Sequence, residues 1–163
     1  MEQFNLLPDD SLWTARRMVM EERWGAKGVV CPCCDGLAKV YKRPFNKTMG
    51  KILIQMYIWE KKEPGRWHHV KNEWPYQPKT FNSEYARMVD YSLIEAPHDI
   101  RPDGNPDTGH HRITRSGVEF VEGRREVTKR QHCYKGQVIG ESGPQVNISW
   151  VLKRPFNYRE LFT

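Results

Sequence analysis

The chain has 163 residues, enough for one globular domain, and its 38% hydrophobic and 12% aromatic content exclude a disordered chain. Lys and Arg (26) outnumber Asp and Glu (20), giving a net charge of +6 and a pI near 9.2, which favours polyanionic partners such as nucleic acids. An acidic protein partner or solubility alone would also explain this charge. No apolar run reaches the roughly 18 to 20 residues of a membrane span, and the opening MEQFNLLPDD is acidic where a secretion signal is basic. We therefore expect a protein of the cytoplasm.

A first helix is predicted after Pro8, ending at Gly25. Asp9, Asp10 or Ser11 would cap its N-terminus. Apolar residues recur in it at helical spacing, namely Leu12, Ala15, Val19 and Met20. Its other face carries Arg16, Arg17 and Arg23, which a solvated surface explains as well as a binding stripe does.

A short hairpin and a second helix follow. Residues 29–31 and 37–41 are the predicted strands, with Asp35-Gly36 as the turn. Asn46 is the predicted cap of a helix over residues 46–61, which Glu63-Pro64-Gly65 ends. Its apolar positions follow the i, i+3, i+4, i+7 pattern of one buried face: Met49, Ile52, Leu53, Met56 and Tyr57.

The middle of the chain alternates short elements. We predict a strand over 66–70 (RWHHV), a helix over 83–91, a strand over 93–97, a turn-rich loop over 98–109 and a strand over 110–113. Thr114 is a candidate cap for one or two helical turns.

The last part of the chain is predicted to hold a second hairpin and a short helix. Lys135-Gly136 is the expected hairpin turn, and the helix is expected around residues 148–152. The pentapeptide KRPFN occurs at 42–46 and again at 153–157, and without matching flanks it indicates coincidence rather than a repeated unit.

The order helix, strand, helix, strand, loop, strand across 46–113 is typical of a winged helix-turn-helix. The predicted fold class is α+β, with a winged-helix core (46–123), an N-terminal helix (1–28), a cysteine hairpin (29–45) and a C-terminal hairpin with its tail (124–163), all in one compact domain. In this fold the helix before the hairpin enters the DNA major groove. The predicted DNA contacts are Lys39, Lys42, Arg43, Lys47, Lys51, Lys79, Ser83, Arg87 and Arg101. A second basic cluster comprises Arg124, Arg125, Lys129 and Arg130.

Several motifs of the chain resemble those of a family of small phage and prophage winged-helix proteins. They are C-P-x-C with A-K-V-Y-K-R and N-x-x-M (residues 31–49), W-x-H-V (67–70), Y-S-L-I-E (91–95), R-I-T-x-x-G-x-x-F-V (112–121), G-x-V-I-G (136–140) and Y-R-E-L (158–161). The resemblance covers most of the chain from about residue 29 onward. It implies a winged-helix fold and a phage origin, hence the cytosol of a bacterial host, but no particular activity.

The four cysteines predict a metal site or free thiols, because thiols stay reduced in the cytosol. Cys31 and Cys34 form a C-x-x-C half-site for structural Zn²⁺. The sequence holds no second such motif, so the other ligands would come from His68, His69, His132 or Cys133. The family resemblance favours His69, and we expect His69 and Cys133 to complete the zinc site.

Two other interpretations of the cysteines stay open. The thiols could be half-buried apolar groups. A redox pair is less favoured, because the predicted strand after the motif gives no helix dipole to activate a thiol.

The sequence favours a non-enzymatic function. The pairs His68-His69 and His110-His111 suggest an HNH-type nuclease, but the Asn and second His that such a site needs are not found downstream. No P-loop, nucleophile elbow or dinucleotide motif occurs. We expect a regulatory DNA-binding protein with structural zinc. The alternative is a protein-binding inhibitor of a host enzyme or defence complex that presents acidic residues, among them Glu84, Asp90, Asp103 and Asp107.

Overall fold

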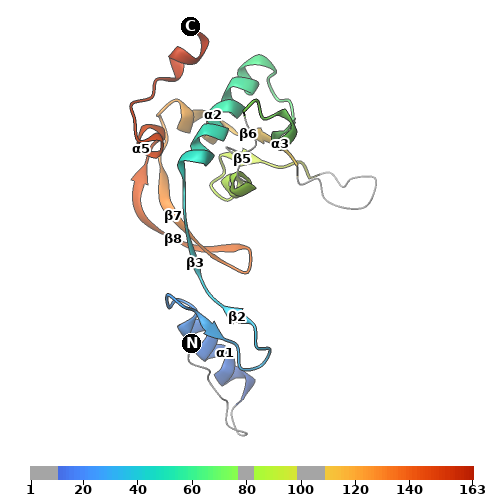
Figure 1. Cartoon of the computed structure of the whole chain (residues 1–163), viewed down its shortest axis with the longest axis vertical. Helices are drawn as coiled ribbons and strands as arrows, with labels where there is room; N and C mark the ends of the chain where they lie inside the picture. Colours follow the sequence, from blue (N-terminus) through green and yellow to red (C-terminus); the bar gives the residue numbers. More distant parts are fainter. Residues whose placement is uncertain (1–10, 77–82, 99–108) are drawn as a thin grey trace. The chain divides into compact units, whose positions relative to one another are not determined.

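A computed structural model describes residues 11–76, 83–98 and 109–163 of the chain (Figure 1). The fold is mixed α+β, and its strands pair in antiparallel fashion. The chain folds as two compact units, each built from segments that are distant in the sequence. Unit 1 comprises Met1–Pro44 and Arg130–Ser142, and unit 2 comprises Phe45–Lys129 and Gly143–Thr163.

Unit 1 begins with helix α1 (Leu12–Glu22), capped by Ser11, whose hydroxyl accepts the Thr14 N–H at 3.2 Å. Strands β1 (Val29–Val30) and β2 (Leu37–Ala38) form the predicted hairpin. Val19 of α1 packs in a small core with Val29 and Ala38. Leu12 and Met20, which share the predicted apolar stripe, are exposed.

The predicted strand over 37–41 is wrong in its second half. Val40 is buried, and its N–H donates to the Arg23 carbonyl at 2.8 Å, so β2 stops at Ala38. The chain then forms a separate strand, β3 (Tyr41–Pro44), that pairs with β7 (Val127–Tyr134). Strand β8 (Gln137–Val146) completes a sheet of order β3-β7-β8.

The turn between β7 and β8 is confirmed at Lys135-Gly136. Both residues have positive φ, 48° and 77°, as a type I′ hairpin turn requires.

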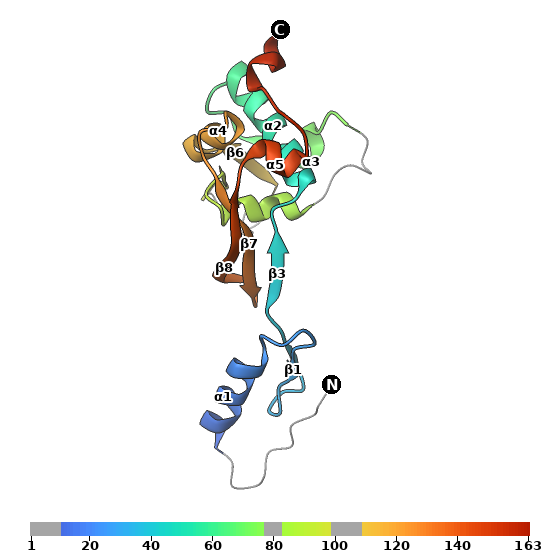
Figure 2. The ribbon, with the colours of Figure 1, turned by 90° about the vertical axis from the view of Figure 1, so that its left-hand side faces the viewer.

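Helix α2 (Lys47–Lys62) is confirmed with its cap, because the Asn46 side chain accepts the Met49 N–H at 3.0 Å. All five of its predicted core positions are buried. The helix contacts α4 (Arg115–Val121), α5 (Ile148–Leu152) and η2 (Ser83–Val89), and it is the central element of unit 2 (Figure 2).

A second sheet has the order β4-β6-β5, formed by β4 (His68–His69), β6 (His110–Ile113) and β5 (Ile94–Glu95). The predicted strand over 66–70 is wrong at both ends, because β4 begins only at His68 and Val70 begins a short helix, α3 (Val70–Glu73). His69 caps α3 by accepting the Asn72 N–H at 3.3 Å, and Glu73 accepts the His69 N–H at 3.0 Å. This reciprocal cap makes helix rather than strand the stable local structure.

The predicted third helix is shorter and tighter than expected. It is the 3₁₀ helix η2, and it ends at Val89 instead of residue 91. Ser92, with a φ of 58°, reverses the chain into β5, which is limited to Ile94–Glu95 within the predicted 93–97.

Thr114 caps α4 as predicted, and α5 lies where expected. A final 3₁₀ helix, η3, spans Tyr158–Phe162. The main core of unit 2 is buried around α2 and includes Phe45, Met49, Leu53, Met88, Leu93, Ile113, Phe120, Ile148 and Leu152.

Candidate nucleic-acid interface

Strand β3 presents an exposed tyrosine between two cations. Tyr41 keeps 43% of its surface accessible. The Lys39 ammonium lies 5.5 Å and the Arg43 guanidinium 5.1 Å from its ring centroid. Alternate residues of an extended chain lie on the same side, which explains why the side chains at positions 39, 41 and 43 are neighbours. We call Lys39, Tyr41 and Arg43 the β3 face.

Residues opposite the strand add no acid to this surface. Tyr41 is paired with Cys133, Lys42 with His132, Arg43 with Gln131 and Pro44 with Arg130. Lys39 and Lys42 make no ion pair with any carboxylate in the described part of unit 1. Their charge is therefore not offset by a local partner, which favours an external polyanion.

Lys47 and Lys51 lie in the first turns of α2 in unit 2, and both are exposed. The first turn of this helix holds no acidic residue. A cation near a helix N-terminus opposes the macrodipole at a cost of about 0.3–1 kcal/mol. Helix stability therefore does not explain these two lysines, whereas an anion bound near the helix start would be favoured by both.

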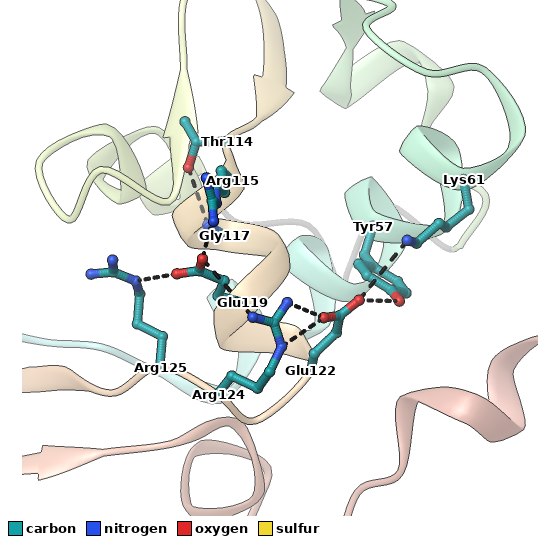
Figure 3. A network of polar contacts seen from close by, with 9 residues as sticks. All are labelled: Tyr57, Lys61, Thr114, Arg115, Gly117, Glu119, Glu122, Arg124 and Arg125. Atoms are coloured by element: carbon teal, nitrogen blue, oxygen red, sulfur yellow. Dashed lines mark hydrogen bonds and ion pairs between the residues drawn. The ribbon is translucent and has the colours of Figure 1, made fainter.

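Two of the four residues in the second predicted basic cluster, Arg124 and Arg125, are paired with acids (Figure 3). Arg125 Nε donates to Glu119 at 3.2 Å, and Arg124 binds Glu122 at 2.5 Å. These bonds hold the pKa of both carboxyls below the ordinary value, with the arginine bond as the leading cause in each case. Lys129 lies 4.7 Å from the ring centroid of Trp150. Arg124 and Arg125 thus stabilise unit 2 and are poorer phosphate ligands than the sequence suggested.

The predicted base-reading helix is tied to its neighbours. Glu84 accepts a hydrogen bond from Asn46 Nδ2 at 3.0 Å, and Arg87 is half-buried with its Nη1 atom fully enclosed. Ser83 is the first residue of η2. Lys79 and Arg101 lie outside the described residues. The other predicted contacts that the structure describes lie on or beside β3, namely Lys39, Lys42 and Arg43, or in the first turns of α2, namely Lys47 and Lys51.

Cys31 and Cys34 lie in the tight turn between β1 and β2. The Cys31 N–H donates to the Gly36 carbonyl and the Asp35 N–H to the Cys31 carbonyl, each at 2.9 Å, while Asp35 takes a φ of 56°. Backbone N–H groups of Cys33 and Cys34 hydrogen-bond the Cys31 sulfur and lower the pKa of its thiol. Partial desolvation and the Cys31 sulfur raise the pKa of Cys33. The turn thus favours the thiolate of Cys31, the form in which a cysteine binds metals. Cys34 is the second cysteine of the C-x-x-C motif.

The other two predicted zinc ligands are placed in different surroundings. Cys133 is a half-buried residue of β7 in unit 1, opposite Tyr41. His69 belongs to unit 2, where its ring lies 5.0 Å from that of His110. Across residues 11–76, 83–98 and 109–163, no group of three or more His, Cys, Asp or Glu side chains has a metal-binding arrangement.

The histidine pairs divide as the alternation of a strand predicts. His68 and His111 are buried opposite each other in β4 and β6, and His69 and His110 are half-exposed. His68 Nδ1 lies 2.8 Å from Glu73 Oε2, and its ring stacks on Trp59. The buried pair therefore belongs to the packing of unit 2.

Tyr41 was not predicted from the sequence as a contact residue, although the alternation Lys39, Tyr41, Arg43 was the signal that could have identified it.

Comparisons with models of protein families, with curated proteins and with solved structures found no match. Within the described ranges, no helix has the length and apolar character needed to cross a bilayer.

Proposed function

We propose that this chain is a DNA-binding protein with a winged-helix core and a structural zinc, acting as a regulator. The element order α2, β4, α3, η2, β5, β6 supports the core assignment, with the single-turn helix α3 as an addition to the usual order. So does the sheet order β4-β6-β5, in which the strand between the two helices pairs with the hairpin that follows them. No catalytic step is part of the proposal.

The observation that carries the proposal is the contrast between two sets of cations. Arg124 and Arg125 are neutralised by Glu119 and Glu122. Lys39, Lys42, Lys47 and Lys51 have no acidic partner in the part of the chain that the structure describes. Phosphate groups are the ligands that such unpaired lysines favour, and Tyr41 adds a ring on which a sugar or base can pack.

Salt-dependent DNA binding tests the proposal. We expect a duplex to bind at micromolar protein in about 50 mM salt and to be released steeply as salt rises. Replacing Lys39 and Arg43 together by Gln should weaken binding by about tenfold and reduce the salt slope by about 2.

Lys62 and Lys71 are exposed residues far from β3 in the sequence, and their double Gln variant removes the same charge. An equal loss in both double variants would show a net-charge effect and contradict a role of the β3 face. No binding at all in low salt would contradict the DNA proposal itself.

The zinc part of the proposal has its own test. Cys31 and Cys34 would supply two thiolates, with Cys133 of the same unit as a further predicted ligand. We expect the purified chain to hold zinc that Cys34→Ser removes and Cys33→Ser leaves in place, because Cys33 has no predicted part in the site. A chain free of zinc after purification without chelator would contradict this.

A protein-binding inhibitor is a second candidate, favoured by the exposed end of α1. Leu12 and Trp13 are 78% and 66% exposed, and Arg17 lies over the Trp13 ring at 5.1 Å. Trp and Arg are enriched at binding hot spots. This candidate predicts that one host protein is captured from a lysate despite nuclease treatment, and that Trp13→Ser abolishes the capture. Loss of capture on nuclease treatment would favour the DNA proposal.

A further inference from the structure

Unit 2 contains an apolar pocket of about 370 Å³ that the proposed DNA contacts do not explain. Ile54 and Ile58 of α2 line it together with Trp74, Leu152 and Phe156. Its volume falls within the range of about 300–1,000 Å³ that small-molecule sites occupy. The pocket can therefore enclose the apolar part of a small ligand.

Two features of the chain build this pocket. Positions 51, 54, 55 and 58 of α2 follow the i, i+3, i+4, i+7 pattern, so they form one stripe along the helix. On the other side, Lys153 ends α5 with a φ of 57°. The backbone carbonyl of Ser149 then accepts a hydrogen bond from the Arg154 N–H at 3.2 Å. The side-chain hydroxyl of Ser149 accepts one from the Phe156 N–H at 3.1 Å. These bonds fix the segment that faces α2.

All the charged side chains that line the pocket are positive. Lys51 and Arg154 line it, and no Asp or Glu does. Both side chains are exposed, and neither pairs with a carboxylate anywhere in the described chain. An apolar cavity with two unpaired cations is complementary to a molecule with an apolar body and an anionic head.

We propose that this pocket binds an amphipathic monocarboxylate, such as a medium-chain fatty acid. The hydrocarbon chain lies against Ile54, Ile58 and Phe156, and Lys51 and Arg154 hold the carboxylate. Burial of the chain supplies most of the affinity, and the two cations supply the selection for an acid. Lys51 is shared with the proposed DNA contacts, whereas the apolar lining and Arg154 are not.

Decanoate and decanol, which share one hydrocarbon chain, separate the two contributions in calorimetric titrations of the full chain. We expect decanoate to bind more tightly than decanol by about tenfold or more. The double variant K51Q/R154Q should bind both molecules equally, at the affinity of wild type for decanol. A wild type that binds neither molecule, or does not distinguish them, overturns the proposal.

A second experiment fills the pocket with a larger side chain. Ile54→Trp should weaken decanoate by about tenfold or more, because the larger side chain occupies the cavity. Leu161→Trp fills the same pocket from the C-terminal segment and serves if the first variant does not fold. A folded variant of either kind that binds decanoate as wild type does would place the ligand elsewhere and overturn the assignment.

Discussion

The Tyr57 hydroxyl donates a hydrogen bond to Glu122 Oε1 over 3.0 Å, joining residues 65 positions apart (Figure 3). Tyr57 is a core residue of α2, and Glu122 is the C-cap of α4. Lys61 Nζ lies 3.9 Å and Arg124 Nη2 2.5 Å from the same carboxylate. Burial, followed by the bond to Glu122, raises the pKa of Tyr57 to about 12. The phenol therefore remains protonated, and a hydrogen-bond donor, at neutral pH.

Tyr57→Phe removes this bond without changing the ring. We expect the free energy of unfolding to fall by about 1.5–3 kcal/mol, since the acceptor is charged. Urea unfolding monitored by circular dichroism measures it. Tyr158→Phe is the control, because the hydroxyl of that half-buried residue accepts a long hydrogen bond from Arg159, at 3.5 Å. Equal losses in the two variants would contradict the importance of the Glu122 bond.

Glu122 makes stability depend on pH. Its pKa is lowered from 4.5, first by the bond to Arg124 and then by the bond from Tyr57. Its ionised form is thus favoured in the folded state, so this stability is present above pH about 4.5 and is lost as pH falls through the lower folded pKa. Melting temperatures from pH 7 down to 3 should fall less steeply in Glu122→Gln than in wild type. Superimposable pH profiles would refute this origin.

Gly117 is required by close packing. A Cβ at this position would lie 2.1 Å from the Leu93 carbonyl oxygen and 2.6 Å from Ile113 Cγ1. Gly117→Ala must displace backbone and should destabilise unit 2 by about 1–3 kcal/mol or more. Ser116→Ala, one position earlier in α4, should change stability by less than about 0.5 kcal/mol. A thermal melt of both variants checks this, and a stable Gly117→Ala would show that α4 can shift away from β5.

Gln131 is fully buried, and neither polar atom of its amide has a hydrogen-bond partner among the described residues. Such a group costs about 1–3 kcal/mol. Gln131→Met keeps the length of the side chain and removes both polar atoms, so we expect it to raise the free energy of unfolding. Gln137→Met, on the exposed first position of β8, is the control. A less stable Gln131→Met would indicate that the amide is satisfied by buried water.

Local signals made parts of the fold predictable from sequence. Helix α2 was identified because its cap, Asn46, and its apolar stripe lie within the same few turns. The Lys135-Gly136 turn was identified for the same reason, since its residue types specify its conformation. The addition of β3 to the C-terminal hairpin joins residues about ninety positions apart, and nothing within 41–44 specifies that partner.

The candidate interface was only partly predictable. Counting cations identified Lys39, Lys42 and Arg43, but it also selected Arg124 and Arg125. The carboxylates that pair with those arginines are only two to six residues away in the sequence. Weighing each cation against its nearby acids would therefore have separated the two clusters. The role of Arg154 in the pocket was not predictable, because it depends on the fold of the C-terminal segment against α2.

The two copies of the pentapeptide KRPFN, at residues 42–46 and 153–157, differ in backbone conformation over their first three residues. In the first, Lys42 to Pro44 belong to an extended strand, whereas Lys153 in the second is left-handed and ends a helix. The final Phe-Asn nevertheless behaves alike in both, since Phe45 and Phe156 pack on the core and Asn46 and Asn157 cap the next helix. In both copies the Phe-Asn dipeptide thus precedes a helix, with Phe packed on the core and Asn as the N-cap. The conformation of the three residues before it depends on their tertiary contacts.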